Sequence, residues 1–327
     1  MKFESFIGNR KIIERLRTKL REGRFPHGLI FSGPEGVGKH TCAQMVAKSL
    51  NCLNAVPGEF CDKCTSCRKI GAGTHPDVMT ISVEHEATQI KIAQVRNLLS
   101  TLDLHPLEGR NKVFVIDPAD LLNAEAANAL LKGLEEPPEN SFLILITVNV
   151  HELLLTVRSR CQVYNFTPLT LDEVRQNGVT DELTVRWSRG SIGRARSVDI
   201  ARLKSEREVL LDFLETVITA KEDQFQDLLG VSADLGRAKQ DFESRMEIMA
   251  VVIGDILYIK EGVPHKLVNV DAQDRLTNLA ARASVEGLLK MAEFLRFIES
   301  SLKSHVNRQM LTDVLAITGN EAASRLL

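Results

Sequence analysis

Four cysteines that lie close together in the sequence could bind a metal ion. Cys52, Cys61, Cys64 and Cys67 have the spacing C-x8-C-x2-C-x2-C. Zn²⁺ takes four thiolate ligands in a tetrahedron, and the single turn CDKCTSC supplies three of them. In a cytoplasm that keeps thiols reduced, clustered cysteines indicate metal binding rather than disulfides. The sequence therefore predicts a structural zinc site, because four protein ligands leave no open coordination position.

Two other interpretations of these cysteines stay open. The pattern C-x2-C-x2-C also binds iron–sulfur clusters in ferredoxins, although there a fourth cysteine usually follows four residues later, at the position of Gly71 here. The four thiols could also carry no metal. Cys42 and Cys161 lie outside the spacing, and we expect them to pack as small core residues.

A glycine-rich segment, LIFSGPEGVGKHT, has the types and spacing of a phosphate-binding loop. It contains the pattern G-x-x-x-x-G-K after an apolar strand and before a helical run. In that context backbone amides wrap a phosphate group, and the lysine reaches the outer phosphates of a nucleotide. The nucleotide-binding residues that we predict are Gly33, Gly36, Gly38, Lys39, Thr41 and Asp117.

Two departures from the pattern of an ATP-hydrolysing site, one in this segment and one at the end of a later strand, argue against ATP hydrolysis. His40 stands where a Ser or Thr hydroxyl would hold Mg²⁺, and Thr41 comes one place late. The second acidic strand ends in Asp117 and Pro118, so the metal-binding acid is present but the glutamate that would polarise water is absent. We therefore predict a degenerate site that does not hydrolyse ATP, and whether it binds ATP stays open.

Alternating strands and helices must position these residues. Apolar strand-like runs occur at HGLIFSG, KVFVID and SFLILITVN, and helical runs lie between them. This alternation predicts a parallel sheet with helices on both faces. Strand signals fade after about residue 165, and from residue 203 onward the chain reads as helices. The residues alone thus predict an α/β module, a short connection and an all-helical C-terminal domain.

Composition narrows the function classes. A length of 327 residues suggests two or three domains, and a net charge of −2 predicts no wholesale attraction to nucleic acid. A basic helical run over residues 9–24 is either a solvated face or a contact with a phosphate backbone. The longest apolar stretch, residues 142–148, is too short for a membrane helix, and the N-terminus shows no export signal. We expect a cytoplasmic protein with no membrane partner.

The segments AANALLKGLEEPP (residues 126–138) and RSRC (residues 158–161) resemble motifs of the AAA+ clamp-loader subunits of bacterial DNA polymerase III. THPDV, IKIAQVRNLL and the position of the four-cysteine insert support the resemblance, which covers about residues 3–200. It implies an AAA+ P-loop core over residues 1–165 with the zinc insert at about residues 52–67, a small helical lid over residues 166–203, and an all-helical collar over residues 204–327.

The resemblance also implies roles for single residues. Arg160 matches the arginine finger that reaches into the ATP site of a neighbouring subunit. The family's ATP-sensing arginine would fall at Gly193, with Arg194 displaced by one place, so a third catalytic part is missing. For His75, in the segment HPD, we expect a structural turn rather than a catalytic base.

The function implied is that of a stator. Such a subunit helps to load the sliding clamp onto primed DNA, and it sits in a hetero-pentamer with subunits of the tau/gamma and delta types. It would be a component of the DNA polymerase holoenzyme with no catalysis of its own. Two alternatives stay open: an active AAA+ clamp-loader ATPase of the tau/gamma type, and a separate zinc-ribbon protein that binds nucleic acid.

Overall fold

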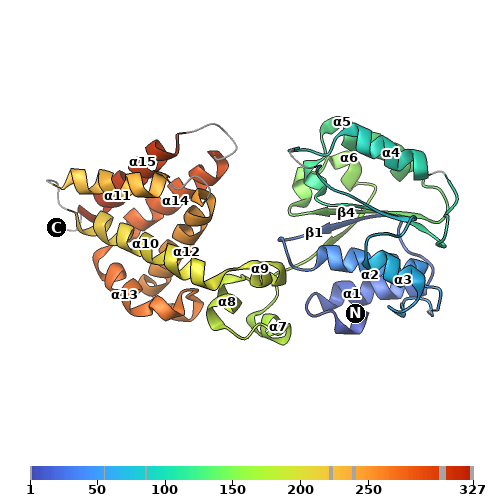
Figure 1. The fold of residues 1–327 in the computed structure, drawn as a ribbon, viewed down its shortest axis with the longest axis horizontal. Coiled ribbons are helices and arrows are strands. Elements are labelled where there is room, and N and C mark those ends of the chain that lie inside the picture. Colours follow the sequence, from blue (N-terminus) through green and yellow to red (C-terminus); the bar gives the residue numbers. More distant parts are fainter. Residues whose placement is uncertain are drawn as a thin grey trace. The chain divides into compact units, whose positions relative to one another are not determined.

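The computed structural model describes residues 2–54, 56–84, 87–102, 104–220, 224–237, 241–301 and 307–324. The chain divides into two compact units, shown in Figure 1. The first unit comprises Met1–Thr180 and Ser188–Arg196, and the second comprises Asp181–Trp187 and Ser197–Leu327. Each unit has its own hydrophobic core.

A parallel sheet forms the centre of the first unit. Its strand order is β2-β3-β4-β1-β5, and every neighbouring pair is parallel. The strands are β1 (Gly28–Ser32), β2 (Val78–Ile81), β3 (Lys112–Ile116), β4 (Ser141–Thr147) and β5 (Gln162–Asn165). All residues of β1 and β3 are buried, which explains why these segments read as continuous apolar runs. The predicted parallel sheet is confirmed.

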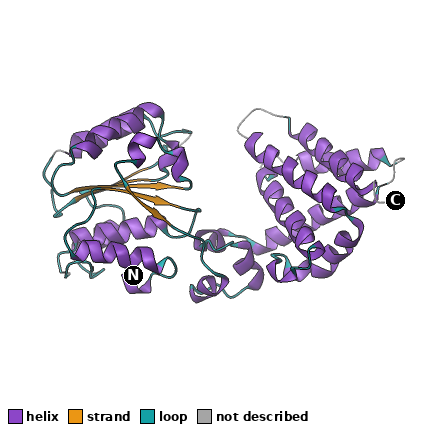
Figure 2. Ribbon diagram, turned by 180° about the vertical axis from the view of Figure 1, so that it is seen from behind, coloured by secondary structure: helices purple, strands orange, loops and turns teal. Residues whose placement is uncertain are grey.

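Helices cover both faces of this sheet, as Figure 1 and Figure 2 show. One face carries α1 (Arg10–Arg21), α2 (Lys39–Asn51) and α3 (Thr65–Gly71), and the other carries α4 (Ile92–Leu102), α5 (Ala124–Glu135) and α6 (Leu155–Arg158). Short 3₁₀ turns lie at Phe3–Ser5, Ala119–Leu121 and Val150–Glu152. Helix α5 begins where the Asn123 side chain accepts a hydrogen bond from the Ala126 N–H, and it ends just before Pro137.

Three short helices follow the sheet. They are α7 (Leu171–Gln176), α8 (Glu182–Trp187) and α9 (Ile192–Ser197). Helix α7 and nearly all of α9 belong to the first unit, whereas α8 belongs to the second. The segment that we predicted as a separate lid is therefore shared between the two units, and the three-domain division stays a prediction.

The described part of the second unit is helical throughout. It contains α8, α10 (Ile200–Thr219), α11 (Phe225–Arg237), α12 (Phe242–Lys260), α13 (Gln273–Arg282), α14 (Val285–Ser301) and α15 (Arg308–Ser324), with 3₁₀ turns at Pro264–Lys266 and Val270–Ala272. Leu210, Val252 and Leu315 are among the residues of its apolar core. The predicted all-helical C-terminal region is confirmed. Across the described residues, no helix combines the length and apolarity needed to cross a bilayer.

Candidate functional site

The glycine-rich loop between β1 and α2 has the backbone of a phosphate-binding loop. Gly33, Gly36 and Gly38 have φ angles of 145°, 70° and 100°, which side-chain-bearing residues rarely adopt. These angles turn the chain sharply from the end of the strand into the first turn of the helix. The sequence pattern therefore folds as predicted, with the loop amides at the N-terminus of α2.

Lys39, the first residue of α2, is engaged by its own loop. Its Nζ donates to the carbonyl oxygens of Gly33 and Pro34, the second at 2.7 Å, and the residue is only 6% exposed. Burial lowers the pKa of Lys39, while the negative charges of Asp117, Glu35 and Asp120 oppose that shift. A phosphate group would therefore have to exchange with these two carbonyls to bind the lysine.

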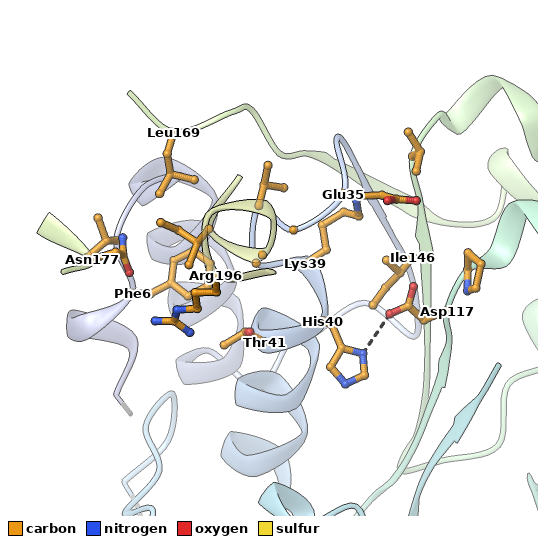
Figure 3. A pocket seen from close by; sticks show the side chains of 18 of the residues that line it. Phe6, Glu35, Lys39, His40, Thr41, Asp117, Ile146, Leu169, Asn177 and Arg196 are labelled. Carbon is orange, nitrogen blue, oxygen red and sulfur yellow. Dashed lines mark hydrogen bonds and ion pairs between the residues drawn. The ribbon is translucent and has the colours of Figure 1, made fainter. Parts of the chain in front are cut away.

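His40 and Asp117, the two residues at the positions where magnesium ligands are expected, bond to each other. The distance from His40 Nδ1 to Asp117 Oδ2 is 3.0 Å, drawn as the dashed line in Figure 3, and the other ring nitrogen lies 3.3 Å from Gln44 Nε2. Mg²⁺ prefers oxygen ligands in a strict octahedron. The residues present do not fit this ion, because an imidazole replaces the hydroxyl ligand and also bonds the carboxylate.

A pocket of about 480 Å³ opens beside this loop, a size typical of small-molecule sites. Five of the six predicted nucleotide-binding residues line it, and the sixth, Gly33, accepts a hydrogen bond from Lys39 instead. Phe6, Leu169 and Ile192 add apolar lining. In Figure 3, Arg196 and Asn177 lie on the opposite side of the pocket from Asp117. The pocket therefore combines apolar lining with a carboxylate-rich side at Glu35 and Asp117.

Helix α9 lies directly on the phosphate loop. The Gly193 N–H donates to the Gly36 oxygen at 3.0 Å. A Cβ added to Gly36 would come within 2.2 Å of Ser191 Oγ, and one added to Gly193 would lie 2.9 Å from Gly36 Cα. The resemblance placed a sensor arginine at position 193. With the backbones of residues 36 and 193 at this separation, that position has no room for a side chain.

Sequence reasoning missed Arg196 as a pocket residue. It lies on α9 one turn after Gly193, and its side chain is exposed at the pocket. The sequence could have predicted this position, because residues three apart on a helix share a face and Gly193 was already expected at the nucleotide site. Helix α9 thus brings to this pocket a guanidinium from position 196, whereas the sequence analysis considered only positions 193 and 194.

The four cysteine sulfurs converge as predicted. All four Sγ atoms lie within 4.8 Å of one another, and those of Cys52 and Cys64 are 4.0 Å apart. A tetrahedral zinc with bonds of about 2.3 Å would place its sulfurs about 3.8 Å apart. Cys52 follows the last residue of α2, and Cys64 caps the N-terminus of α3. The cluster can therefore bind a metal ion, and its geometry suits zinc.

Backbone N–H groups point at these sulfurs. Cys61 N–H donates to Cys52 Sγ at 3.2 Å, and Cys64 N–H donates to Cys61 Sγ at 3.3 Å. Donation from the Lys63 and Cys64 amides lowers the pKa of Cys61 to about 6, which favours the thiolate that a metal needs. Cys42 is fully buried outside this cluster, and burial raises the pKa of Cys161 to about 12.

Arg160 lies between α6 and β5, outside the pocket of its own chain as far as the described residues show. Its Nη2 is 2.5 Å from Glu135 Oε1, and its Nη1 donates to the Thr156 oxygen at 2.9 Å. About a third of the side chain (35%) is exposed. The guanidinium therefore lies at the surface, held by contacts from α5 and α6.

The HPD segment has a structural role. The His75 ring contacts Ser66 Oγ at 3.2 Å, and the residue is 3% exposed. The Asp77 carboxylate accepts three backbone N–H groups of residues 107–109, at 2.7–2.8 Å. Burial of Asp77 opposes ionisation, but the three donors together hold its pKa below the usual value. These contacts agree with the structural turn expected for His75.

Comparison with known proteins adds two family matches. The model of the family "DNA polymerase III, delta subunit" matches residues 8–170, and the model of the family "DNA polymerase III, delta subunit, C terminal" matches residues 203–317. The delta-prime subunit of DNA polymerase III from Bacillus subtilis is 27% identical over 314 residues, which are 94% of each chain. These matches extend over both units.

A second group of relatives matches a smaller part of the chain at higher identity. The tau subunit of DNA polymerase III from B. subtilis is 35% identical over 193 residues, which are 58% of this chain and 34% of tau. This chain thus spans about a third of that relative's length.

Two solved structures match most of the chain. A gamma-subunit-related protein of DNA polymerase III from Thermotoga maritima has 19% identity and a TM-score of 0.45, covering 95% of this chain and 99% of its own. The DNA clamp loader delta protein of B. subtilis has 10% identity and a TM-score of 0.36, covering 94% and 99%.

Proposed function

Since this chain belongs to the DNA polymerase III delta-subunit family, we propose that it is a clamp-loader subunit of the delta-prime type that acts in DNA replication. Its partners would be subunits of the tau/gamma and delta types in a hetero-pentamer, together with the sliding clamp and primed DNA. The match over 94% of the delta-prime relative supports this type, because the tau relative matches over only part of its length.

Within that assembly the chain would not hydrolyse ATP. The observation that carries this proposal is the His40–Asp117 bond of 3.0 Å, which ties up the acid that would hold Mg²⁺. The contact between α9 and the loop supports it, because Gly193 cannot carry the sensor arginine there. Phosphoryl transfer depends on metal and cationic side chains to neutralise charge in the transition state, and this pocket retains Lys39 but lacks the hydroxyl ligand at position 40 and the arginine at position 193.

Arg160 would instead act on a neighbouring subunit's ATP. A guanidinium stays charged and presents a planar fork of donors that suits phosphate oxygens. Its exposed position and its absence from this chain's pocket, among the described residues, support action in trans. Removing such a finger is expected to lower the rate at one active site of the assembly by orders of magnitude, about 10³-fold or more.

Reconstitution of the clamp loader tests this proposal. Loaders assembled with wild-type chain or with Arg160→Ala are compared for ATP turnover in the presence of clamp and primed DNA. We expect a partial fall with Arg160→Ala, because the other sites keep their own fingers, and poor rescue by Arg160→Lys, which lacks the fork. Unchanged turnover by a fully assembled Arg160→Ala loader would show that this chain's contribution is architectural only.

The metal of the cysteine cluster is proposed to be structural zinc. Four converging sulfurs without a vacant ligand position support a closed site, which stabilises the insert rather than performing chemistry. Metal analysis of the purified full chain by mass spectrometry tests this assignment, with one zinc per chain expected. A brown protein with visible absorbance would indicate an iron–sulfur cluster instead.

An active ATPase of the tau/gamma type is the second candidate function. The 35% identity to tau over 193 residues and the intact glycine–lysine pattern favour it. Steady-state turnover by the isolated, highly purified chain separates the two functions. Turnover that disappears with Lys39→Ala would support the ATPase and overturn the stator proposal.

A further inference from the structure

We propose that Glu135 holds the guanidinium of Arg160 inside this chain and competes for it with the phosphate of the neighbouring subunit. This inference rests on the proposed action of Arg160 in trans. Glu135 would be a positioning residue, because it acts only through the arginine. Its release of Arg160 would be a step that the neighbour's nucleotide has to drive.

The backbones that carry the two side chains are fixed against each other. Gly28, at the start of β1, packs between them. A Cβ added there would lie 2.8 Å from the Leu134 side chain, 3.0 Å from Cys161 Sγ and 3.3 Å from the Arg160 oxygen. Leu134 and Val157 also share the core of the first unit. Glu135 and Arg160 therefore face each other because buried neighbours on both segments place them so.

The contacts use the donors that a phosphate would need. Nη2 of Arg160 pairs with Glu135 at 2.5 Å, and Nη1 donates to the Thr156 oxygen at 2.9 Å. A guanidinium binds a phosphate most strongly through two parallel N–H donors. Each terminal nitrogen of Arg160 is thus engaged inside the chain, so a neighbour's phosphate competes with Glu135 for the charge and the Nη2 donor of this guanidinium.

Helix electrostatics alone do not favour Glu135 at its position. It is the last residue of α5, where the partial negative charge of the helix end disfavours a carboxylate. Glu136 and Glu139 follow within four residues and add more negative charge. The guanidinium of Arg160 offsets this local charge, so the carboxylate and the arginine stabilise each other while the subunit is free.

The ion pair between Arg160 and Glu135 is weak enough for a phosphate group to displace the carboxylate. The side chains are 35% and 49% exposed, and exposed ion pairs contribute little because water and salt screen them. Removing the competing charge should therefore increase the availability of Arg160 by about two- to fivefold, the range that exposed pairs support. A phosphate with more than one negative charge can displace a single carboxylate under these conditions.

Glu135→Gln in the assembled loader tests this inference, because glutamine keeps the shape and removes the charge. Glu136→Gln is the matched control, since it changes the adjacent carboxylate and leaves the bond to Arg160 in place. We expect Glu135→Gln to raise kcat/KM for ATP at the site served by Arg160 by about two- to fivefold at low salt, and Glu136→Gln to leave it near wild type. The gain should shrink as salt rises, which a packing effect would not do.

A double-mutant cycle separates this inference from the proposed function. In an Arg160→Ala background, Glu135→Gln should have no effect, because nothing is left to release. If Arg160→Ala itself leaves turnover unchanged, the finger proposal is wrong and this inference falls with it. If Arg160→Ala lowers turnover but Glu135→Gln matches wild type, only the competition is wrong. A fall in kcat/KM with Glu135→Gln would also overturn it, by showing that the carboxylate holds the finger in its productive position.

Discussion

Restoring the family's sensor arginine at position 193 should damage the first unit instead of reviving its ATPase. A Cβ on Gly193 would lie 2.9 Å from Gly36 Cα, and the obstacle is backbone, which cannot rotate away. Overpacking of this kind costs about 1–3 kcal/mol, because neighbouring atoms have to shift. For a unit of this size each kcal/mol lowers the melting temperature by about 2–4 °C, so we expect a loss of about 2–12 °C.

The matched control is Gly71→Ala, also at a helical position of the first unit. Its nearest contact would be Lys48 Nζ at 3.4 Å, an ordinary separation from the end of a flexible side chain. Gly193→Ala tests the contact itself, and Gly193→Arg tests the restored sensor. Both should lose stability relative to Gly71→Ala, and neither should gain ATP turnover.

Two probes assign the change to the correct unit. The single tryptophan, Trp187, lies in the core of the second unit, so its fluorescence reports unfolding there. Far-UV circular dichroism reports both units, and hydrogen exchange of residues 33–41 reports the phosphate loop. We expect earlier loss of the dichroism signal and faster exchange in the loop, with an unchanged tryptophan transition. A Gly193→Arg chain that melts with Gly71→Ala and hydrolyses ATP would refute this reasoning.

Three further outcomes are expected. Cys64→Ser should remove the bound zinc, as measured by mass spectrometry, and leave the Trp187 transition in place, since a lost structural ligand acts locally; retention of a full equivalent of zinc would contradict the four-sulfur site. His40→Thr should create a magnesium-dependent gain in ATP affinity, measured by calorimetry with and without chelator, whereas the unmodified chain should show no such gain. Asp77→Asn should lower the free energy of unfolding at pH 7 by about 1.5–3 kcal/mol, the range for hydrogen bonds to a charged group. Because folding depresses the pKa of Asp77, its contribution is present above about pH 4 and is lost as pH falls through the folded-state value, so urea denaturation should show the difference between the two chains shrinking as the pH is lowered below about 4.

Local patterns predicted the parts of the site that are continuous in sequence. The glycine loop, Lys39 and the four cysteines are set by spacing, and the structure brings each group together as expected. The sheet was predictable for a similar reason, because strands buried on both faces are apolar throughout.

Pairs that form across the fold were not predictable in this way. His40 and Asp117 were each recognised as departures from an active site, but their bond depends on how α2 lies against the end of β3. The link between Glu135 and Arg160 depends on the packing around Gly28. The contact of Gly193 with Gly36 joins segments more than 150 residues apart. No local periodicity encodes such contacts, since they follow from packing that only the whole unit defines.

Helix α2 connects the phosphate loop to the cysteine cluster. Lys39 is its first residue, and Cys52 follows its last, Asn51. At 1.5 Å per residue, a helix of 13 residues is about 20 Å long, more than twice the screening length of about 8 Å at physiological salt. Where solvent ions surround the helix, the charge of a bound metal is therefore largely screened before it reaches a phosphate in the pocket. We expect metal loss to affect the loop mainly through α2 itself, as fraying or tilting of this helix from its C-terminal end.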